Sequence, residues 1–400
     1  MKLNGPIGAA MAAVASACVG APHAQQLAAP VTIPFELRND LPVMHVRVNG
    51  VDALLVLDTG SGALVLDSAF AVQARVPLDA GRGAMANGRT PIRMGTASTV
   101  APGGAVAMHD VMAVVADLTP VQRRLGFDVR GTVGNQIFRD YVVTVDYRAR
   151  TVTLADPAHF RYAGTGAPLA IRVEHDVPIT DAVVVTRRSG AIPASLTVDL
   201  GSSSYALRLS RRFLAQHPLE GDTVTVPVQL GAGVGGVDRG ALMRLPALRL
   251  GALTVNRPST VLSLTRTGPF GDAAPSDGTI GAGILRRARV TIDYSHSVIY
   301  VEPESSLGAP DSIDASGLAV ARVGASDPRW RVEAVVPTSP ADSAGVQVGD
   351  VITAVDDRSV ANLAPGELQH RLRDAGTTCR LTIERARQVI AVQLVLRPVV

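Results

Sequence analysis

Two aspartates, Asp58 and Asp199, each end an apolar run and stand directly before a glycine-containing turn. The first lies in LLVLDTGSGALVLD, residues 54–67, and the second in SLTVDLGSSSYAL, residues 195–207. Burying a carboxylate is costly unless it is hydrogen-bonded or paired. Two carboxyls held about 3 Å apart cannot both ionise easily, so they share one proton. Such a pair can act as general base and general acid, with one member taking a proton from water and the other hydrogen-bonding a carbonyl under attack.

The residues beside each aspartate fit this chemistry. Gly60 and Gly201 let the backbone turn sharply and approach another chain segment closely. Thr59, Ser61 and Ser202 carry hydroxyls that we expect to hold the carboxylates.

A long internal repeat explains why the chain contains two such aspartates. GTVGNQIFRDYVVTVDYRARTVTL begins at Gly131 and GTIGAGILRRARVTIDYSHSVIYV begins at Gly278, an offset of 278 − 131 = 147 residues. Asp199 follows Asp58 by 199 − 58 = 141 residues, so the copies differ in length by six residues between the motifs. Repeats of this length indicate two similar lobes rather than a solenoid.

The elements that must position these residues read as strands. Short β-branched runs are bounded by Gly, Pro and Asp, and no long amphipathic helix is evident from residue 31 to residue 305. The clearest runs are Val43–Val48, Leu54–Leu57, Val111–Val115, Val142–Val145 and Thr151–Leu154. The pattern predicts an all-β protein.

The chain resembles the aspartic peptidases of the pepsin-like and retropepsin-like group over about residues 35–305. Asp58-Thr59-Gly60-Ser61 matches the family's Asp-Thr-Gly-Ser motif. The family also has an apolar-apolar-Gly element behind each active-site loop, and Thr132-Val133-Gly134 and Thr279-Ile280-Gly281 resemble it. The resemblance implies two β-barrel lobes, over residues 31–160 and 161–304, with catalytic Asp58 and Asp199 between them. Thr59, Gly60, Ser61, Gly201 and Ser202 would support the site.

The implied activity is hydrolysis of peptide bonds in peptides or unfolded proteins, by a water activated between the two aspartates. Leu200 departs from the family, whose second motif carries a threonine at this position. The alternative is therefore a non-catalytic envelope peptide-binding protein whose second motif has degenerated. No cofactor or metal is expected, and because both aspartates lie in one chain, catalysis requires no oligomer.

Two glycine-rich stretches stand where the family has hairpin flaps over its cleft. They span Gly81–Gly104 and Gly231–Gly236. The second, GAGVGG, also fits a dinucleotide-binding pattern, but no strand–helix–strand unit or suitably placed acidic residue accompanies it. We therefore interpret both stretches as hairpins.

The C-terminal part forms a separate pattern. TSPADSAGVQVGDVITAVDDRSV, residues 338–360, resembles the PDZ family, so residues 305–315 are expected to be a linker and 316–400 a small β-rich PDZ domain with two short helices. The helices are expected at Ala341–Ala344 and Pro365–Arg373. Gly317, Leu318, Ala319 and Val320 resemble the loop whose N–H groups hold a peptide's C-terminal carboxylate. Ala319 replaces a glycine of that loop, and the alternative is a PDZ domain used only for internal docking.

The N-terminus reads as an export signal over residues 1–24. Lys2 precedes a small-residue apolar stretch from Ile7 to Gly20, and either Gly20-Ala21 or His23-Ala24 can end it. We expect export to the periplasm or surface of a bacterium, with a lipid anchor at Cys18 as the alternative. Cys379 would then be the single cysteine of the mature chain, and it lies in a strand-like run.

Other classes of protein find little support in the sequence. The formal net charge is +3 and the arginines are scattered, which argues against a nucleic-acid partner. No later segment reaches the roughly 18 consecutive apolar residues of a transmembrane helix. The histidines lack metal-ligand spacing.

Overall fold

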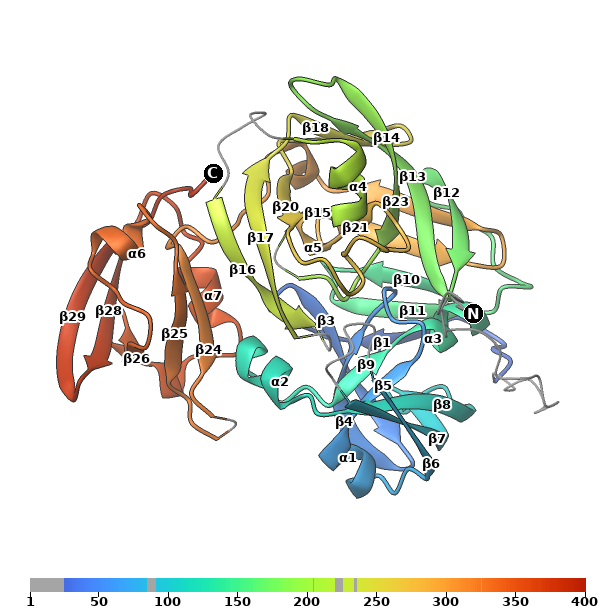
Figure 1. Ribbon diagram of the computed structural model, residues 1–400. Helices are drawn as coiled ribbons and strands as arrows, with labels where there is room; N and C mark the ends of the chain where they lie inside the picture. The colour runs from blue at the N-terminus through green and yellow to red at the C-terminus, as the bar shows by residue number, and fades with distance from the viewer. Residues whose placement is uncertain (1–24, 85–90, 204, 220–225, 234–235, 325) are drawn as a thin grey trace, which may run out of the picture.

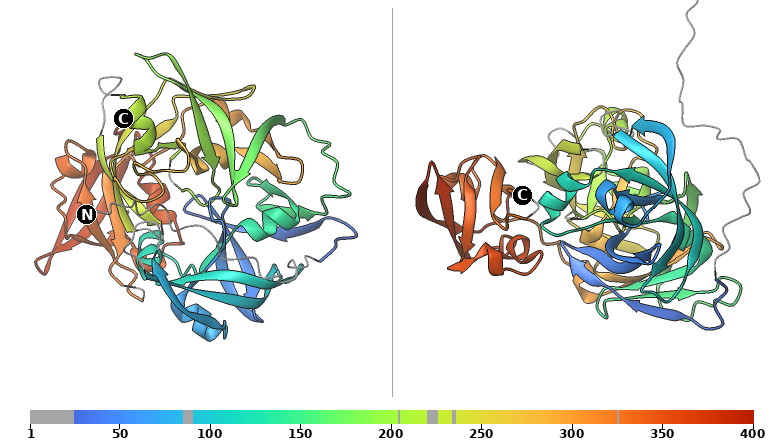
Figure 2. Two further views of the ribbon diagram at one scale, coloured as in Figure 1. Left: turned by 45° about the vertical axis from the view of Figure 1, so that its right-hand side comes forward. Right: turned by 90° about the horizontal axis from the view of Figure 1, so that it is seen from below.

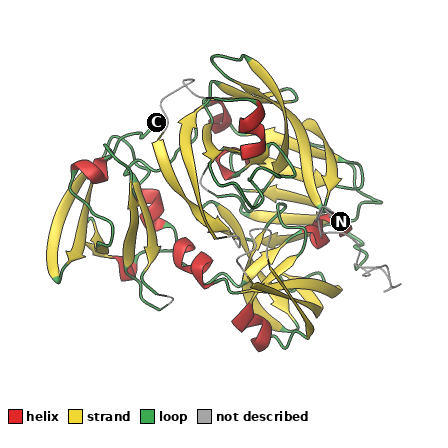
Figure 3. Ribbon diagram, in the orientation of Figure 1, coloured by secondary structure: helices red, strands yellow, loops and turns green. Residues whose placement is uncertain are grey.

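A computed structural model describes residues 25–84, 91–203, 205–219, 226–233, 236–324 and 326–400 of the chain. The predicted signal peptide, residues 1–24, lies outside the described residues. Strands dominate the described part and the helices are short (Figure 3). The all-β expectation is therefore confirmed. Within the described ranges, no helix has the length and apolar character needed to cross a membrane.

The first lobe is built on an eight-stranded sheet. Its strands are β2 (Glu36–Arg38), β3 (Leu41–Val48), β4 (Val51–Leu57), β5 (Leu64–Asp67), β6 (Leu78–Ala84), β7 (Pro91–Pro102), β8 (Met108–Ala116) and β9 (Gly131–Val133). β4 runs parallel to β9, with Leu57 opposite Val133. β6 and β7 pair antiparallel at the first predicted flap, whose residues 85–90 lie outside the described part.

A fifteen-stranded sheet contains the second lobe. Its strands within residues 161–304 are β12 (Ala167–Glu174), β13 (Val177–Val185), β14 (Ala191–Val198), β15 (Leu207–Leu209), β16 (Val226–Gly233), β17 (Gly236–Arg244), β18 (Ala247–Leu250), β19 (Leu253–Asn256), β20 (Ser259–Ser263), β21 (Gly278–Ile280), β22 (Ala288–Asp293) and β23 (Val298–Pro303). β14 runs parallel to β21, with Val198 opposite Ile280, as in the first lobe. β16 and β17 pair antiparallel at the second predicted flap, of which residues 234–235 are not described.

Three strands from the first half of the chain complete the same sheet and join the lobes. These are β1 (Val31–Pro34), β10 (Val142–Asp146) and β11 (Thr151–Ala155). β10 pairs antiparallel with β22, and Thr144 lies opposite Thr291 with the two hydroxyl oxygens 2.9 Å apart. Because 291 − 144 = 147, these threonines are the same position of the repeat. The two copies therefore meet through a self-complementary strand pair, and one buried apolar cluster continues through both.

A six-stranded sheet with its own core forms the C-terminal unit, which Figures 1 and 2 show beside the two lobes. Its strands are β24 (Leu318–Arg322), β25 (Trp330–Val335), β26 (Val351–Val355), β27 (Arg358–Ser359), β28 (Thr378–Arg385) and β29 (Gln388–Val395). Cys379 is a buried, free thiol in β28, as expected of a core residue.

The helices are short throughout the described part. They are α1 (Ser68–Gln73), α2 (Thr119–Leu125), α3 (Asn135–Asp140), α4 (Arg211–Gln216), α5 (Ala282–Leu285), α6 (Pro340–Ser343) and α7 (Glu367–Arg371), with 3-10 turns at Ser305–Gly308 and Val360–Asn362. α6 begins one residue earlier than expected, because the Ser339 hydroxyl caps it by accepting the Asp342 N–H. α7 is shorter than expected, because Gly366 precedes it with φ 84°.

Candidate active site

The two aspartates occupy equivalent places at the ends of β4 and β14. The Asp58 N–H donates to the Val133 carbonyl and the Asp199 N–H to the Ile280 carbonyl, both at 3.0 Å. Val133 and Ile280 belong to the two apolar-apolar-Gly elements. These elements therefore lie behind the two loops, as the resemblance implied.

Backbone N–H groups hold both carboxyls. The Gly60 N–H donates to Asp58 Oδ1 and the Gly201 N–H donates to Asp199 Oδ1, each at 2.8 Å. The N–H groups of Ser61 and Ser202 add to this on their own sides. Four of the predicted support residues thus act through their backbones.

The glycines also let the two loops approach each other. A Cβ atom on Gly60 would lie 2.5 Å from Asp199 Cγ, and one on Gly201 would come about as close to Asp58 Cγ. Real side chains do not tolerate such contacts, so each loop needs glycine opposite the other's aspartate. The structure therefore brings Asp58 and Asp199 together across the two lobes.

The pair is arranged to hold one proton. Burial raises the pKa of Asp58, although hydrogen bonds from Asp199 and the Gly60 N–H oppose the rise. Burial, the charge of Asp58 and the hydrogen bond between the two side chains raise the pKa of Asp199 well above its usual value. The two carboxyls titrate as a unit, and together they can supply one base and one acid.

The hydroxyl of Thr59 links the lobes from one side only. Thr59 Oγ1 donates to the Val198 carbonyl at 2.6 Å and accepts the Leu200 N–H at 3.0 Å. Thr59 and Leu200 are both fully buried. Because Leu200 has no hydroxyl, it cannot return these bonds to the first lobe, and one threonine connects both loops.

This arrangement corrects the expected role of two hydroxyls. The Thr59 hydroxyl bonds the opposite lobe rather than its neighbouring carboxylate, and the Ser61 hydroxyl donates to the Ala63 carbonyl at 2.7 Å. The backbone amides already satisfy the carboxylates, which leaves these hydroxyls free to fix the loops.

Two equivalent tyrosines of the repeat were not assigned a role from the sequence. Tyr147 and Tyr294 are equivalent in the repeat, since 294 − 147 = 147. Burial raises the pKa of both hydroxyls, and negative charges add to the shift, first that of Asp40 and then that of Asp199 at Tyr147, and first that of Asp176 and then that of Asp58 at Tyr294. Their shared position directly after Asp146 and Asp293 was the available signal.

The predicted PDZ loop adopts the turn that its glycine requires. Gly317 has φ 80°, and Leu318, Ala319 and Val320 begin β24, the edge strand of the C-terminal sheet. The Gly317 N–H donates to Asp314 Oδ1 at 2.6 Å and the Leu318 N–H donates to Ser316 Oγ at 3.1 Å. These two N–H donors of the loop are thus used within the chain, and Ala319 and Val320 lie in the antiparallel ladder with β25.

Comparison with known proteins identifies two domains. Residues 44–135 match the aspartyl protease family and residues 331–385 match the PDZ domain family. Asp58 lies within the first match and Asp199 lies outside it. These matches confirm the resemblance to an aspartic peptidase with a C-terminal PDZ domain.

Similarity over the whole length of known proteins is weaker. No curated protein matches the chain. Among solved structures, the crystal structure of aspartic proteinase from Irpex lacteus aligns with 70% of this chain and 99% of its own, with 13% identity and a TM-score of 0.44.

Proposed function

We propose that this chain, an aspartyl-protease-like protein with a C-terminal PDZ domain, is an exported aspartic-type endopeptidase that uses Asp58 and Asp199. The observation that supports this most is the pair itself. Two carboxyls from equivalent loops are held by equivalent backbone N–H groups and approach each other between two lobes.

The proposed mechanism needs only these two side chains and a water. The ionised carboxylate accepts a proton from the water as its oxygen attacks the carbonyl carbon of the peptide bond. The protonated carboxyl hydrogen-bonds the carbonyl oxygen, on which negative charge develops. The carboxyl that took the proton from the water then passes it to the leaving nitrogen, and the C–N bond breaks to give a carboxylic acid and an amine. No bond forms between enzyme and substrate.

The remaining parts of the proposal concern place and partners. We propose that residues 1–24 direct export to a bacterial periplasm or cell surface. Peptides or unfolded proteins are the proposed substrates. The PDZ domain contributes peptide recognition or regulation, and the internal hydrogen bonds of its loop favour regulation.

The decisive experiment is proteolysis of casein by the chain from residue 25 onward, scanned from pH 3 to 8 with and without pepstatin. Asp58→Asn and Asp199→Asn should each lower activity by at least about 10²-fold, since positioned acid–base groups contribute about 10²–10⁴-fold. Because the pair shares one proton, wild-type activity should fall at both ends of the pH range. Unchanged thermal unfolding of the variants would show that they fold.

The same experiment decides against the proposal in two ways. Cleavage that persists in either variant would rule out the paired-aspartate mechanism. A wild-type chain that cleaves at no pH, yet binds peptides as well as Asp58→Asn does, would be the non-catalytic binding protein.

A further inference from the structure

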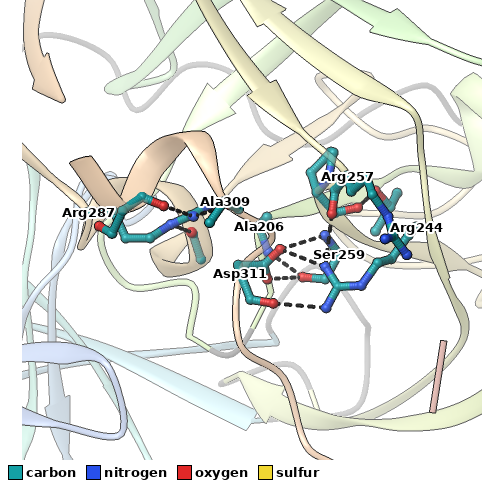
Figure 4. Close-up of polar contacts among 11 residues, drawn as sticks. Ala206, Arg244, Arg257, Ser259, Arg287, Ala309 and Asp311 are labelled. Carbon is teal, nitrogen blue, oxygen red and sulfur yellow. Dashed lines mark hydrogen bonds and ion pairs between the residues drawn. The ribbon is translucent and has the colours of Figure 1, made fainter. Parts of the chain in front are cut away.

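The segment between the protease lobes and the PDZ domain is attached to the second lobe along much of its length. The buried Asp311 carboxylate accepts the Ser259 N–H at 2.8 Å, the Ser259 hydroxyl, and Arg244 Nη1 at 3.1 Å (Figure 4). Arg287 Nη1 donates to the Ser306 and Ala309 carbonyls at 2.7 and 2.6 Å. Residues 305–315 were expected to be a linker, but these contacts leave the PDZ domain little freedom to swing.

Helix α2 of the first lobe lies against the edge strand of the PDZ domain. α2 contacts both β24 and β16, and Figure 1 shows it between the first lobe and the C-terminal sheet. Arg123 Nε donates to the Arg322 carbonyl of β24 at 2.8 Å, and Arg124 forms an ion pair with Glu333 at 2.5 Å. An extended peptide adds to a sheet at an open edge strand. Here α2 already occupies one end of that edge.

Helix α2 is also packed against the first lobe. Val121 and Leu125 pack on a small apolar cluster of that lobe. Gly126, which ends the helix with φ 78°, lies directly against the ring of Trp330 in β25. The same helix thus has an apolar side toward the protease and an arginine side toward the PDZ domain.

A buried ion cluster joins all three units. Asp40 of the first lobe forms an ion pair with Arg373, which lies just after α7 of the PDZ domain. It also forms an ion pair with Arg286, the residue that ends α5 of the second lobe, with 3.5 Å between Arg286 Nε and Asp40 Oδ1. The Asp40 side chain is 2% exposed. Although burial raises the pKa of Asp40, the charges of Arg373 and Arg286 and a hydrogen bond from Arg373 outweigh it and hold the pKa below its usual value. The cluster therefore stays charged at mildly acidic pH.

Helix α5 connects this cluster to Asp199. The Ala282 N–H donates to the Ser202 carbonyl at 2.8 Å, and the Gly283 N–H donates to the Tyr205 carbonyl at 3.1 Å. Arg286, at the other end of α5, contacts Asp40. Val399 and Val400, beyond the last PDZ strand, share an apolar cluster with Tyr205.

We infer that the partner of the PDZ domain is the protease body of its own chain, and that this docking positions α5 and the loop of Asp199. The PDZ domain then acts as a fixed support of the cleft rather than as a mobile domain that binds peptides. The positioning half of this inference rests on the proposed function, whereas the docking half does not.

The test uses the chain from residue 25 onward and measures two quantities in each variant. Hydrogen exchange of β24 and α5 reports docking without any substrate. The second measurement is hydrolysis of a quenched fluorescent peptide whose sequence copies a mapped cleavage site in casein, and it reports kcat and KM separately. Arg373→Glu and Arg124→Glu each reverse the charge of one partner in an ion pair between the PDZ domain and the protease lobes. Arg387→Glu reverses a charge in the exposed β28–β29 turn and is the matched control.

Arg373→Glu should raise exchange in β24 and α5 and lower kcat, each by about tenfold or more, because it removes a buried charged hydrogen bond. KM should change less than about twofold, because the substrate contacts remain. Arg373→Lys should restore most of kcat. Arg124→Glu should act in the same direction, and the exchanged pair Arg124→Glu with Glu333→Arg should restore protection.

Contrary results are equally specific. Unchanged exchange in both charge-reversal variants would overturn the docking. Raised exchange with unchanged kcat would overturn the positioning role. Tight binding of random heptapeptides with a free C-terminal carboxylate, but not of their amides, by the undisturbed chain would instead identify an open peptide site. An inactive wild-type chain would refute the proposed function and leave the exchange test valid.

Discussion

The loop of Asp58 and the loop of Asp199 have the same backbone contacts but different side chains beneath them. In each, the aspartate N–H bonds an apolar-apolar-Gly element and a glycine N–H bonds the carboxylate. Beneath them, Thr59 stands in the first loop and Leu200 in the second. The backbone therefore carries the symmetry that the carboxyl pair needs, and the side-chain link can be supplied from one lobe.

The glycines offer the strongest way to break this equivalence. Gly60→Ala or Gly201→Ala places a methyl group within about 2.5 Å of the opposing carboxyl. We expect activity to fall as far as in Asp58→Asn, by at least about 10²-fold, because the loops must separate. Casein hydrolysis at the optimal pH measures this. Gly308→Ala, where a methyl group meets open space, is the control, and full activity in Gly60→Ala would contradict the close approach.

The difference between Thr59 and Leu200 can be tested by removing the hydroxyl at position 59 and, separately, by adding one at position 200. Thr59→Val keeps the shape but leaves the buried Leu200 N–H without its acceptor, so stability should fall by about 1–3 kcal/mol. Leu200→Thr should keep the hydrogen bond from its backbone N–H to Thr59 Oγ1, so its loss of stability should come only from the smaller, polar side chain in the core. Urea unfolding and kcat report both, with Thr59→Ser as control. Equal losses in the two variants would mean that the link depends on the leucine as well.

A third carboxyl, that of the half-buried Asp314, separates the effect of burial from that of a partner carboxyl. It accepts the N–H groups of Ser316 and Gly317, much as Asp58 accepts that of Gly60, but burial alone raises its pKa to about 6. Because the folded chain raises the pKa of Asp314, this carboxyl adds to the free energy of unfolding while it is protonated. Its contribution is complete below the usual pKa of 3.8 and is lost as the pH rises to about 6.

Asp314→Asn should therefore flatten the pH dependence of stability by a small amount. Relative to the variant, the wild type should lose thermal stability between about pH 4 and pH 6 and change little above that. The difference between their melting temperatures across this window measures the effect. A difference that does not vary with pH would show that Asp314 titrates at its usual value.

The sequence predicted the features that local pattern and repetition encode. DTGS, DLGS and the 147-residue offset located the carboxyl pair and the elements behind it, and SPADSAGVQVGD located the PDZ strands. It did not predict the Asp40–Arg373 contact, which joins residues 333 positions apart. Asn39-Asp40 reads as an ordinary turn, and nothing nearby shows that Asp40 is buried. Asp311 likewise lies in a polar stretch that resembles a flexible linker, because its partners Arg244 and Ser259 come from distant strands.

The pairing of Thr144 with Thr291 has a consequence for the origin of this chain. A strand that pairs with its own copy needs no second, different strand, so an ancestral single lobe could have assembled with an identical molecule. Both loops of such an assembly would carry the same motif. In a single chain the two motifs need not be identical, so Leu200 can stand where the first loop has Thr59. A single chain also has a unique surface, made from Asp40 of one copy and Arg286 of the other, which contacts a single additional domain.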